Sequence, residues 1–420
     1  MTTRRAFLKS TGLGAAALGV TGAVGVTAAK AAQDTGTHAG KIALPPPISN
    51  AERQARIEAA QGLMARQGMA GIVIEAGTSM RYFSDLAWGR GSRLTALIIP
   101  AKGAPVVITP AFEESKLREL MVMDMEVRTW DEHESPFRLI GGVFDDRAAT
   151  GAIGLERTTR HFVADGLAKD SPSRAIVSAS SVVSALRQIK SPREIALMQA
   201  AADITMAAYR ETYAQVDAGM TGADISRIMQ EATRKHGVRP TFTSAQVGEA
   251  SAYPHGSKKV YEVAEGEVIL MDCGCDVHGY KSDISRTWVH GEPSAEHRRV
   301  WQTARAGQDI VMEKAQIGTS FGAVDDAVRA FYEAKGFGPD YATPGLSHRT
   351  GHGIGMDIHE DQFVVRDNDT PIAAGMCFSN EPGIYLPGQF GVRLEDCVYM
   401  TEDGPRLFSP RAPSIEDPIG

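Results

Sequence analysis

The sequence has few cysteines and no excess of positive charge, and each shortage argues against a class of protein. Only four of its 420 residues are cysteine, and none stands in a Cys-x-x-Cys spacing, which argues against a zinc knot. Lysine and arginine number 44 against 51 for aspartate and glutamate, so the formal net charge is −7. Nucleic-acid-binding domains typically carry a basic surface, and we therefore expect no nucleic-acid partner. The length predicts two domains, because it is too great for one compact core.

The first 31 residues resemble a twin-arginine export signal. Arg4 and Arg5 stand before Phe-Leu-Lys, and a weakly apolar stretch rich in glycine and alanine, residues 10–29, follows. Residues 29–31, Ala-Lys-Ala, offer a small-x-small cleavage site. We therefore expect the twin-arginine export machinery to be a partner and the product to be periplasmic or secreted.

Two other interpretations of this N-terminal segment remain open. It could be a cytosolic basic tail, or a retained signal that anchors the protein in the membrane, because residues 10–29 are long enough to span a bilayer. Twin-arginine export moves folded proteins, so a metal site could be loaded in the cytoplasm first. Residues 32–48, polar and then proline-rich, are predicted to be a disordered lead-in.

Residues 49–186 are predicted to form an α/β domain. A capping box of Ser49 and Glu52 should start a helix that ends near Gly68. Helix and strand then alternate, which is typical of an α/β layer. The segment contains no nucleophile or metal-binding cluster, so we expect the chemistry in the rest of the chain. Its predicted strands are the apolar runs at residues 71–75, 94–100, 104–109 and 151–156.

The second domain, residues 187–420, is predicted to begin with a capped helix and to contain an internal repeat. Ser191 can cap a helix that starts at Pro192 and extends to about Val216. Further along, a glycine twice precedes a predicted helix that ends at a second glycine eighteen positions later. This recurrence favours a second domain built from two similar halves, and a chance recurrence is the alternative. The two glycine pairs are Gly219/Gly237 and Gly318/Gly336.

Three histidines and three interleaved glycines mark the candidate site. His348, His352 and His359 fall within twelve residues, and Gly351, Gly353 and Gly355 lie among them. Glycine lets the backbone come close to a bound group, and histidine binds metal or moves protons near neutral pH. A single histidine would be interpreted as structural, but three at this density favour a site.

Carboxylates elsewhere in the chain could complete a metal shell. Residues 267–272 form an apolar strand that ends in Asp272, and burial of an acid is costly unless it is paired or ligated. A turn should bring Asp283 back beside Asp272. Arg393 and Glu395 alternate on a predicted strand and should face the same side.

Two alternatives concern the same region. Glu381, which stands before Pro-Gly, and the other acids could form buried salt bridges with Arg286 and Arg393 instead of binding metal. Cys273 and Cys397 stand beside or near these acids, and a disulfide there is an alternative in an oxidising compartment.

Together these motifs resemble the pita-bread metallopeptidases, the family of aminopeptidase P and prolidase. The family pattern is an Asp, a second Asp eleven residues later, a Gly-rich His motif, a Glu before Pro-Gly, and a late Arg-x-Glu, and every piece occurs here in order. The resemblance is strong from about residue 185 to the C-terminus and looser over residues 49–184. It implies an α/β creatinase-like N-terminal domain, an α+β pita-bread domain with a pseudo-twofold repeat, and a homodimer.

The resemblance also implies a dinuclear metal centre. Four carboxylates and one imidazole are an oxygen-rich ligand set that suits two divalent ions, of which Mn²⁺ is expected first and Co²⁺, Zn²⁺ or Fe²⁺ are alternatives. Such ions can hold a bridging water and lower its pKa, so that a hydroxide attacks the scissile carbonyl. The expected ligands are Asp272, Asp283, His352, Glu381 and Glu395.

Catalytic roles beside the metals follow from the same resemblance. Glu381 is expected to pass on the proton, because a metal-bound Glu can double as a shuttle. His359 matches the family histidine that steadies the tetrahedral intermediate. His255 matches the histidine that contacts substrate near the scissile bond, and His348 matches another pocket histidine. Arg393 is expected to orient the neighbouring ligand or the substrate.

The predicted activity is hydrolysis of the bond between an N-terminal residue and proline, so small proline-containing peptides are the expected substrates. Xaa-Pro aminopeptidase and Xaa-Pro dipeptidase both fit this prediction. One rival is a non-peptidase of the same fold that acts on a small amide or a betaine. Another is a binding protein on an inactive pita-bread scaffold, against which the complete ligand set and the export signal argue.

Overall fold

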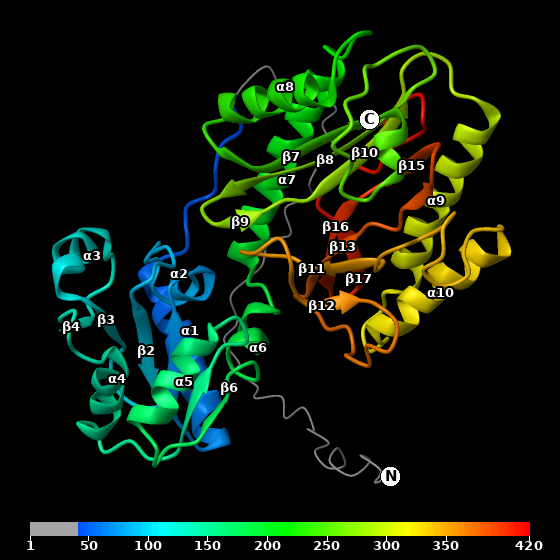
Figure 1. Cartoon of the computed structure of the whole chain (residues 1–420). Helices are drawn as coiled ribbons and strands as arrows, with labels where there is room; N and C mark the ends of the chain where they lie inside the picture. The colour runs from blue at the N-terminus through cyan, green and yellow to red at the C-terminus, as the bar shows by residue number, and fades with distance from the viewer. Residues whose placement is uncertain (1–40) are drawn as a thin grey trace, which may run out of the picture. The chain divides into compact units, whose positions relative to one another are not determined.

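The computed structural model describes residues 41–420 (Figure 1). The predicted export signal and the first part of the predicted lead-in lie outside the described residues. Ile48 is buried, and Ile42 and Leu44 pack against the core, so the end of the lead-in is folded onto the domain and is not disordered. Within residues 41–420, no helix is both long and apolar enough to cross a bilayer.

The first domain begins with the capped helix that the sequence predicts. The Ser49 hydroxyl accepts the backbone N–H of Glu52, and the Glu52 carboxylate accepts the N–H of Ser49, which closes the capping box of α1 (Asn50–Gln67). The helix ends at Gly68, whose φ of 65° is a left-handed conformation that glycine adopts without strain. The fully buried strand β1 (Met69–Glu75) follows directly. Both predicted elements are confirmed.

A six-stranded mixed sheet forms the centre of the first domain. Its order is β4-β3-β2-β1-β5-β6, in which β2 is antiparallel to both neighbours and the outer pairs are parallel. The four predicted strands correspond to β1, β2, β3 and β5, whereas the edge strands β4 and β6 are too exposed to show an apolar run. The remaining elements are β2 (Ala96–Pro100), β3 (Val106–Pro110), β4 (Glu126–Trp130), β5 (Ala152–Leu155), β6 (Ile176–Ser178), α2 (Thr78–Ser84), η1 (Ala111–Glu113), α3 (Glu114–Leu120), α4 (Pro136–Asp145), α5 (His161–Asp170) and α6 (Val183–Arg187).

Two packed helix pairs belong to the second domain. Ser191 caps α7 by accepting the N–H of Glu194, and Pro192 is the first helical residue, as predicted. The helix ends at Tyr213, before the predicted Val216, because the chain then turns towards α8. Helix α7 packs against α8, and α9 packs against α10 (Figure 1). These helices are α7 (Pro192–Tyr213), α8 (Gly222–Lys235), α9 (Ala295–Lys314) and α10 (Phe321–Ala334).

The glycine recurrence marks a structural repeat. All four glycines of the two pairs have a left-handed φ between 81° and 87°, and the helices that they bracket, α8 and α10, each have 14 residues. The N–H of Gly219 donates to the carbonyl of Val263, and the N–H of Gly318 donates to the carbonyl of Ile372, both at 2.8 Å. The same connection is therefore built twice, which supports the predicted pseudo-twofold repeat.

Two sheets of the second domain meet at Ser285 and Glu395. One sheet has the order β10-β8-β7, with β9 paired to β8, and the other has the order β12-β11-β13-β16-β17. The two residues exchange backbone hydrogen bonds of 3.2 and 3.1 Å, which join β10 to the start of β16. The elements are β7 (Arg239–Val247), η2 (Gly248–Ala252), β8 (Val268–Val277), β9 (Tyr280–Lys281), β10 (Ile284–Val289), β11 (Gly351–Gly353), β12 (Glu360–Val364), β13 (Cys377–Asn380), β14 (Ile384–Leu386), β15 (Phe390–Val392), β16 (Asp396–Thr401) and β17 (Gly404–Leu407).

Two predictions about these strands are wrong in detail. Strand β8 does not end at Asp272 but continues to Val277, so this acid lies within a strand. Arg393 and Glu395 lie in the connection between β15 and β16, because the chain crosses there from a two-stranded hairpin to the larger sheet.

All four cysteines are free thiols, so the alternative disulfide does not form.

Candidate metal centre

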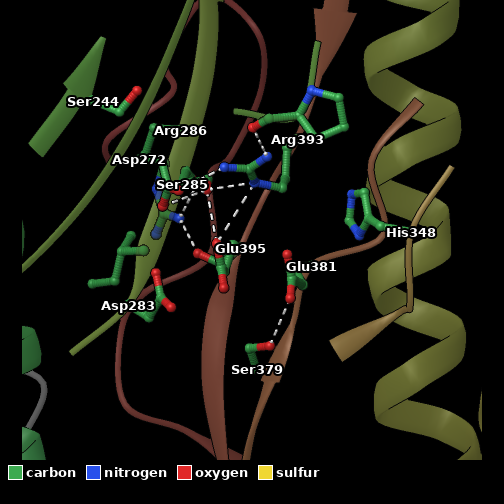
Figure 2. Close-up of polar contacts among 12 residues, drawn as sticks. Ser244, Asp272, Asp283, Ser285, Arg286, His348, Ser379, Glu381, Arg393 and Glu395 are labelled. Atoms are coloured by element: carbon green, nitrogen blue, oxygen red, sulfur yellow. Dashed lines mark hydrogen bonds and ion pairs between the residues drawn. The ribbon is translucent and has the colours of Figure 1, made fainter. Parts of the chain in front are cut away.

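The hairpin of β8 and β10 brings two carboxylates to one face. Ser285 lies opposite Asp272 in the antiparallel register, and Asp283 precedes Ser285 by two positions. Alternate residues share a face, so Asp283 is a diagonal neighbour of Asp272 and not its direct partner. The Ser285 hydroxyl lies 3.0 Å from Asp272 Oδ1 and 2.8 Å from Glu395 Oε2 (Figure 2). The hairpin therefore places the predicted acids Asp272 and Asp283 on one face, and the Ser285 hydroxyl links Asp272 to Glu395.

The Gly-rich motif brings His352 into the same centre. A Cβ atom on Gly351 would clash with the carbonyl of Ser379, and one on Gly353 would clash with the carbonyl of Asp361. Glycine is therefore needed for β11 to fit between β12 and β13. The backbone N–H of His352 donates to the Ser379 hydroxyl at 3.0 Å, and His352 is 3% exposed.

Two glutamates complete the cluster. Glu381 follows β13, and the Ser379 hydroxyl donates to its Oε1 at 3.1 Å (Figure 2). Glu395 is buried at the junction of the sheets. Its Oε1 has no hydrogen-bond partner among the described residues, whereas its Oε2 contacts Ser285. Glu395 thus presents one free carboxylate oxygen in a buried position, which a cation would satisfy.

The tautomer of His352 indicates what the cluster binds. Its Nδ1 lies 3.1 Å from the Gly353 carbonyl oxygen, and only an N–H can bond to that acceptor. Burial lowers the pKa of His352 to about 4, so the ring is neutral near neutral pH and Nε2 carries a lone pair. Nε2 nevertheless lies 3.3 Å from Glu381 Oε1 and 3.6 Å from Asp283 Oδ2. Carboxylates and an imidazole lone pair that face one another suit a cation between them, and a backbone carbonyl on the second nitrogen is typical of a metal-bound histidine.

The carboxylates of the cluster repel one another. Burial, and then the negative charges of the neighbouring acids, raise the pKa values of Asp283 and Glu395 well above the ordinary range. Bound cations reverse this effect, because they favour the ionised form. One ligand atom from each of Asp283, His352 and Glu395 lies within 4.8 Å of the others. Oxygen and imidazole donors at this spacing fit divalent metal ions.

Arginine neutralises only part of the negative charge. Arg393 Nη2 lies 2.6 Å from Asp272 Oδ2, and its Nε lies 3.7 Å from Glu395 Oε2. Arg286 pairs instead with Asp396 at 2.7 Å and reaches Glu395 only through the backbone carbonyl. One arginine cannot balance four acids, so the buried salt-bridge alternative does not account for the cluster.

A chain of hydrogen bonds connects His348 to Arg393. The Nδ1 of His348 lies 2.7 Å from the carbonyl of Arg349 and must donate to it, so Nε2 accepts the hydroxyl of Tyr385 at 2.8 Å. Tyr385 in turn accepts Arg393 Nη1 at 3.0 Å. Burial lowers the pKa of His348 to about 4, which keeps it neutral. Both nitrogens of His348 thus have protein partners. In Figure 2, His348 lies on the side of Glu381 that faces away from Asp283 and Glu395.

The other two predicted histidines lie at the edge of the centre. The rings of His359 and His352 meet edge to face, with centroids 4.3 Å apart. Burial and the nearby imidazoles of His352 and His255 lower the pKa of His359, although Glu381 opposes them. His255 is exposed on the loop after η2. The structure therefore brings all nine predicted site residues into one neighbourhood, in which candidate ligand atoms of Asp283, His352 and Glu395 form the tightest group.

Comparison with known proteins identifies the family. The sequence matches the description "Metallopeptidase family M24" over residues 196–402 and "Creatinase/Prolidase N-terminal domain" over residues 56–189. The probable dipeptidase PepE of Mycobacterium tuberculosis is 33% identical over 356 residues, which cover 83% of this chain and 92% of that protein. The Xaa-Pro dipeptidase of Lactobacillus helveticus is 31% identical over 341 residues, which cover 79% and 90% respectively. The chain belongs to metallopeptidase family M24.

Solved structures similar to this M24 metallopeptidase share its fold. The crystal structure of dipeptidase PepE from Mycobacterium ulcerans matches with a TM-score of 0.80 and 29% identity, and covers 87% of this chain and 98% of that one. The X-Pro aminopeptidase from Thermotoga maritima matches with a TM-score of 0.74 and 28% identity, and covers 84% and 97%. The predicted creatinase N-terminal domain and pita-bread second domain are both confirmed.

Two residues of the M24 site, Ser285 and Tyr385, are not part of the motif pattern that the sequence analysis used. Ser285 could be found from the sequence, because it stands two positions after Asp283 on the same strand face. Tyr385 has no such signal. It lies in the β14–β15 hairpin, and only the tertiary fold brings it between His348 and Arg393.

Proposed function

We propose that this M24 metallopeptidase hydrolyses the bond between an N-terminal residue and proline in small peptides. The observation that carries the proposal is the lone pair of His352 Nε2, which faces the carboxylates of Asp283 and Glu381 and calls for a bound cation. Relatives named Xaa-Pro dipeptidase and X-Pro aminopeptidase support the substrate class. They also favour a peptidase over an enzyme that acts on a small amide or a betaine.

Two divalent ions are proposed to bind in the cluster. Four carboxylates and a neutral imidazole suit Mn²⁺, our first choice, and also Co²⁺, Zn²⁺ or Fe²⁺. When bound, such ions polarise a carbonyl group and make a water molecule more acidic. The residues that would hold them are Asp272, Asp283, His352, Glu381 and Glu395.

Glu381 is proposed to move the proton during hydrolysis. Its Oε1 lies 3.3 Å from His352 Nε2, and its side chain is 12% exposed, so the carboxylate lies in the cluster without being fully enclosed. The carboxylate takes a proton from the attacking water and gives it to the proline nitrogen as the C–N bond breaks. The Ser379 hydroxyl, which donates to Glu381 Oε1, holds the carboxylate in one orientation.

Substrate contacts are proposed for the histidines at the edge of the centre. His359 donates a hydrogen bond to the oxygen that becomes negative when the scissile carbonyl is attacked. His255 contacts the substrate near the scissile bond. Arg393 Nη1 donates to the Pro254 carbonyl at 2.9 Å, which ties the loop of His255 to the metal centre. His348 acts through Tyr385 to orient Arg393.

Export and dimerisation are further parts of the proposal. The pair Arg4–Arg5 supports export by the twin-arginine machinery to the periplasm or the medium, with membrane anchoring if the signal is retained. The family resemblance supports a homodimer. Sedimentation analysis that gave the monomer mass at high concentration would contradict the dimer.

The test of the proposed activity is a matched peptide panel. Metal-reconstituted protein is incubated with X-Pro dipeptides and X-Pro-Y tripeptides, and with the same peptides that carry alanine in place of proline. Cleavage of X-Pro alone identifies a dipeptidase, and cleavage of X-Pro-Y identifies an aminopeptidase. The His352→Ala variant controls for contaminating peptidases. Equal cleavage of the alanine peptides, or no cleavage of any proline peptide, would overturn the proposal.

A further inference from the structure

A closed loop separates His352 from His359. Gly353 pairs with Glu360 in the antiparallel ladder of β11 and β12, so the six residues between them form a loop whose ends are held together. His352 directly precedes Gly353, and His359 directly precedes Glu360, so one histidine lies at each end of the loop. The pairing therefore explains why two rings seven positions apart in the sequence lie in contact.

The carboxylate of Glu360 fills the closed loop. Its Oε1 accepts the backbone N–H groups of Met356 at 2.9 Å and Asp357 at 3.2 Å. Glu360 is 9% exposed, so these hydrogen bonds are shielded from water. A buried carboxylate that gathers the N–H groups of its own loop restricts the conformation of that loop, and the loop carries His359.

Two buried cations hold the Glu360 carboxylate in place. Lys190 Nζ lies 2.9 Å from Oε2, and Arg187 Nη2 lies 2.6 Å from Oε1. The side chains of Lys190 and Arg187 are only 2% and 13% exposed. Burial alone would raise the pKa of Glu360, but the two cations hold it at about 2. The carboxylate is therefore ionised near neutral pH.

The first domain takes part in the same cluster. Arg187 also contacts Asp357 Oδ2 at 2.7 Å and donates to the hydroxyl of Ser79 at 2.9 Å. The Thr78 hydroxyl donates to Asp357 Oδ1 at 2.6 Å. The loop is thus attached at Asp357 and Glu360 to side chains from α2, α6 and the segment that precedes α7. A cavity of about 460 Å³ borders this cluster, and its lining includes His359.

We propose that Glu360 is a positioning residue that, with Arg187 and Lys190, holds the loop so that the His359 ring stays against the metal centre. This inference rests on the proposed function, because the role of His359 in hydrolysis belongs to it. Among residues 41–420, Glu360 makes no hydrogen bond or ion pair with His352 or with the acids of the cluster. It acts through the loop and therefore affects the rate and not the metal content.

The variant Glu360→Gln keeps the shape of the side chain and removes its charge. Asp361→Asn is the matched control, because Asp361 is the next residue of β12, borders the same cavity and pairs with Arg157, yet makes no hydrogen bond to the loop. Glu360→Gln should lower kcat about 10- to 100-fold with both metals bound and KM nearly unchanged, the scale of a misplaced catalytic group. Asp361→Asn should leave kcat within about twofold, as expected for a partly exposed ion pair.

A double-mutant cycle tests whether Glu360 acts through His359. Once His359→Ala has removed the ring, Glu360→Gln should have little further effect on kcat, whereas independent residues would show additive losses. Additive losses, loss of metal from Glu360→Gln, or an unchanged kcat would each overturn the proposal.

Hydrogen–deuterium exchange provides a readout that does not depend on the substrate. The amides of Met356 and Asp357 should exchange faster in Glu360→Gln than in the wild type, and Asp361→Asn should leave them unchanged. If the wild type cleaved no proline peptide but this exchange pattern held, the proposed function would fail while the loop assignment stood. Unchanged exchange in Glu360→Gln would overturn the loop assignment regardless of activity.

Discussion

The imidazole rings of His352 and His359 meet edge to face, with centroids 4.3 Å apart, but the two rings have different surroundings. His352 is 3% exposed, bonds to the Gly353 carbonyl through Nδ1, and directs Nε2 at two carboxylates. His359 is exposed and, among residues 41–420, makes no hydrogen bond or ion pair with these acids. The contact thus places a residue suited to bind metal beside one suited to act on the substrate.

Loss of the Asp283 charge should empty the metal centre. Asp283→Asn keeps the size of the side chain but removes one of the charges that face His352 Nε2, so bound metal and activity should both fall sharply. Asp276→Asn is the control, because Asp276 lies on the same hairpin and pairs with Lys281 outside the cluster. Elemental analysis checks the prediction, and a normal metal content in Asp283→Asn would exclude this residue as a ligand.

Ser285→Ala tests the contact between the two sheets. The serine hydroxyl lies within 3.0 Å of Asp272 and Glu395, and Arg393 Nε donates to it at 3.0 Å. Its removal should lower metal affinity about 10- to 100-fold, the usual effect of losing a group that orients ligands. Competition with a metal chelator measures the affinity. An affinity equal to that of the wild type would show that Arg393 alone suffices to orient the two acids.

Glu360 should contribute stability that depends on pH. Lys190 and Arg187 hold its folded-state pKa at about 2, below the ordinary 4.5. A lowered carboxyl pKa stabilises the folded state above the unfolded pKa, and the stabilisation disappears as the pH falls from about 4.5 towards 2. The wild type should therefore exceed Glu360→Gln in unfolding free energy by a few kcal/mol, roughly 3, near neutral pH.

Urea denaturation of both proteins across this pH range checks the prediction. The difference between them should shrink below about pH 4, because the glutamine does not titrate while the wild-type carboxylate becomes protonated. A difference that stayed constant from neutral to acidic pH would mean that the ion pairs add no stability.

Export can be tested without change of net charge. Arg4→Lys combined with Arg5→Lys preserves the positive charges but removes the arginine pair that the twin-arginine machinery is expected to recognise. The exported fraction, measured by cell fractionation, should fall to near zero. Lys9→Arg, which leaves the pair intact, serves as the control. An unchanged exported fraction in the double variant would indicate another route.

Local patterns in the sequence predict much of the fold and the site, because their physical causes are local. The capping boxes at Ser49 and Ser191, the glycine that ends α1, and the apolar run before Asp272 involve neighbouring residues only. The same holds for the spacing of His348, His352 and His359.

Contacts between distant segments cannot be predicted in this way. Lys190 reaches Glu360 across 170 positions, and the hydroxyl of Tyr385 connects His348 with Arg393 only after the β14–β15 hairpin has folded back. The register that sets Ser285, and not Asp283, opposite Asp272 also depends on the turn geometry of the hairpin. These features follow from tertiary packing.

The most direct test compares His352→Ala with His359→Ala by metal analysis and steady-state kinetics on a proline peptide. His352→Ala should lose metal together with activity, because its Nε2 faces Asp283 and Glu381. His359→Ala should retain both metals and lower kcat by about 10²- to 10³-fold with little change in KM, as for the loss of one donor to the transition state. The account would be contradicted if His359→Ala lost the metals while His352→Ala kept them.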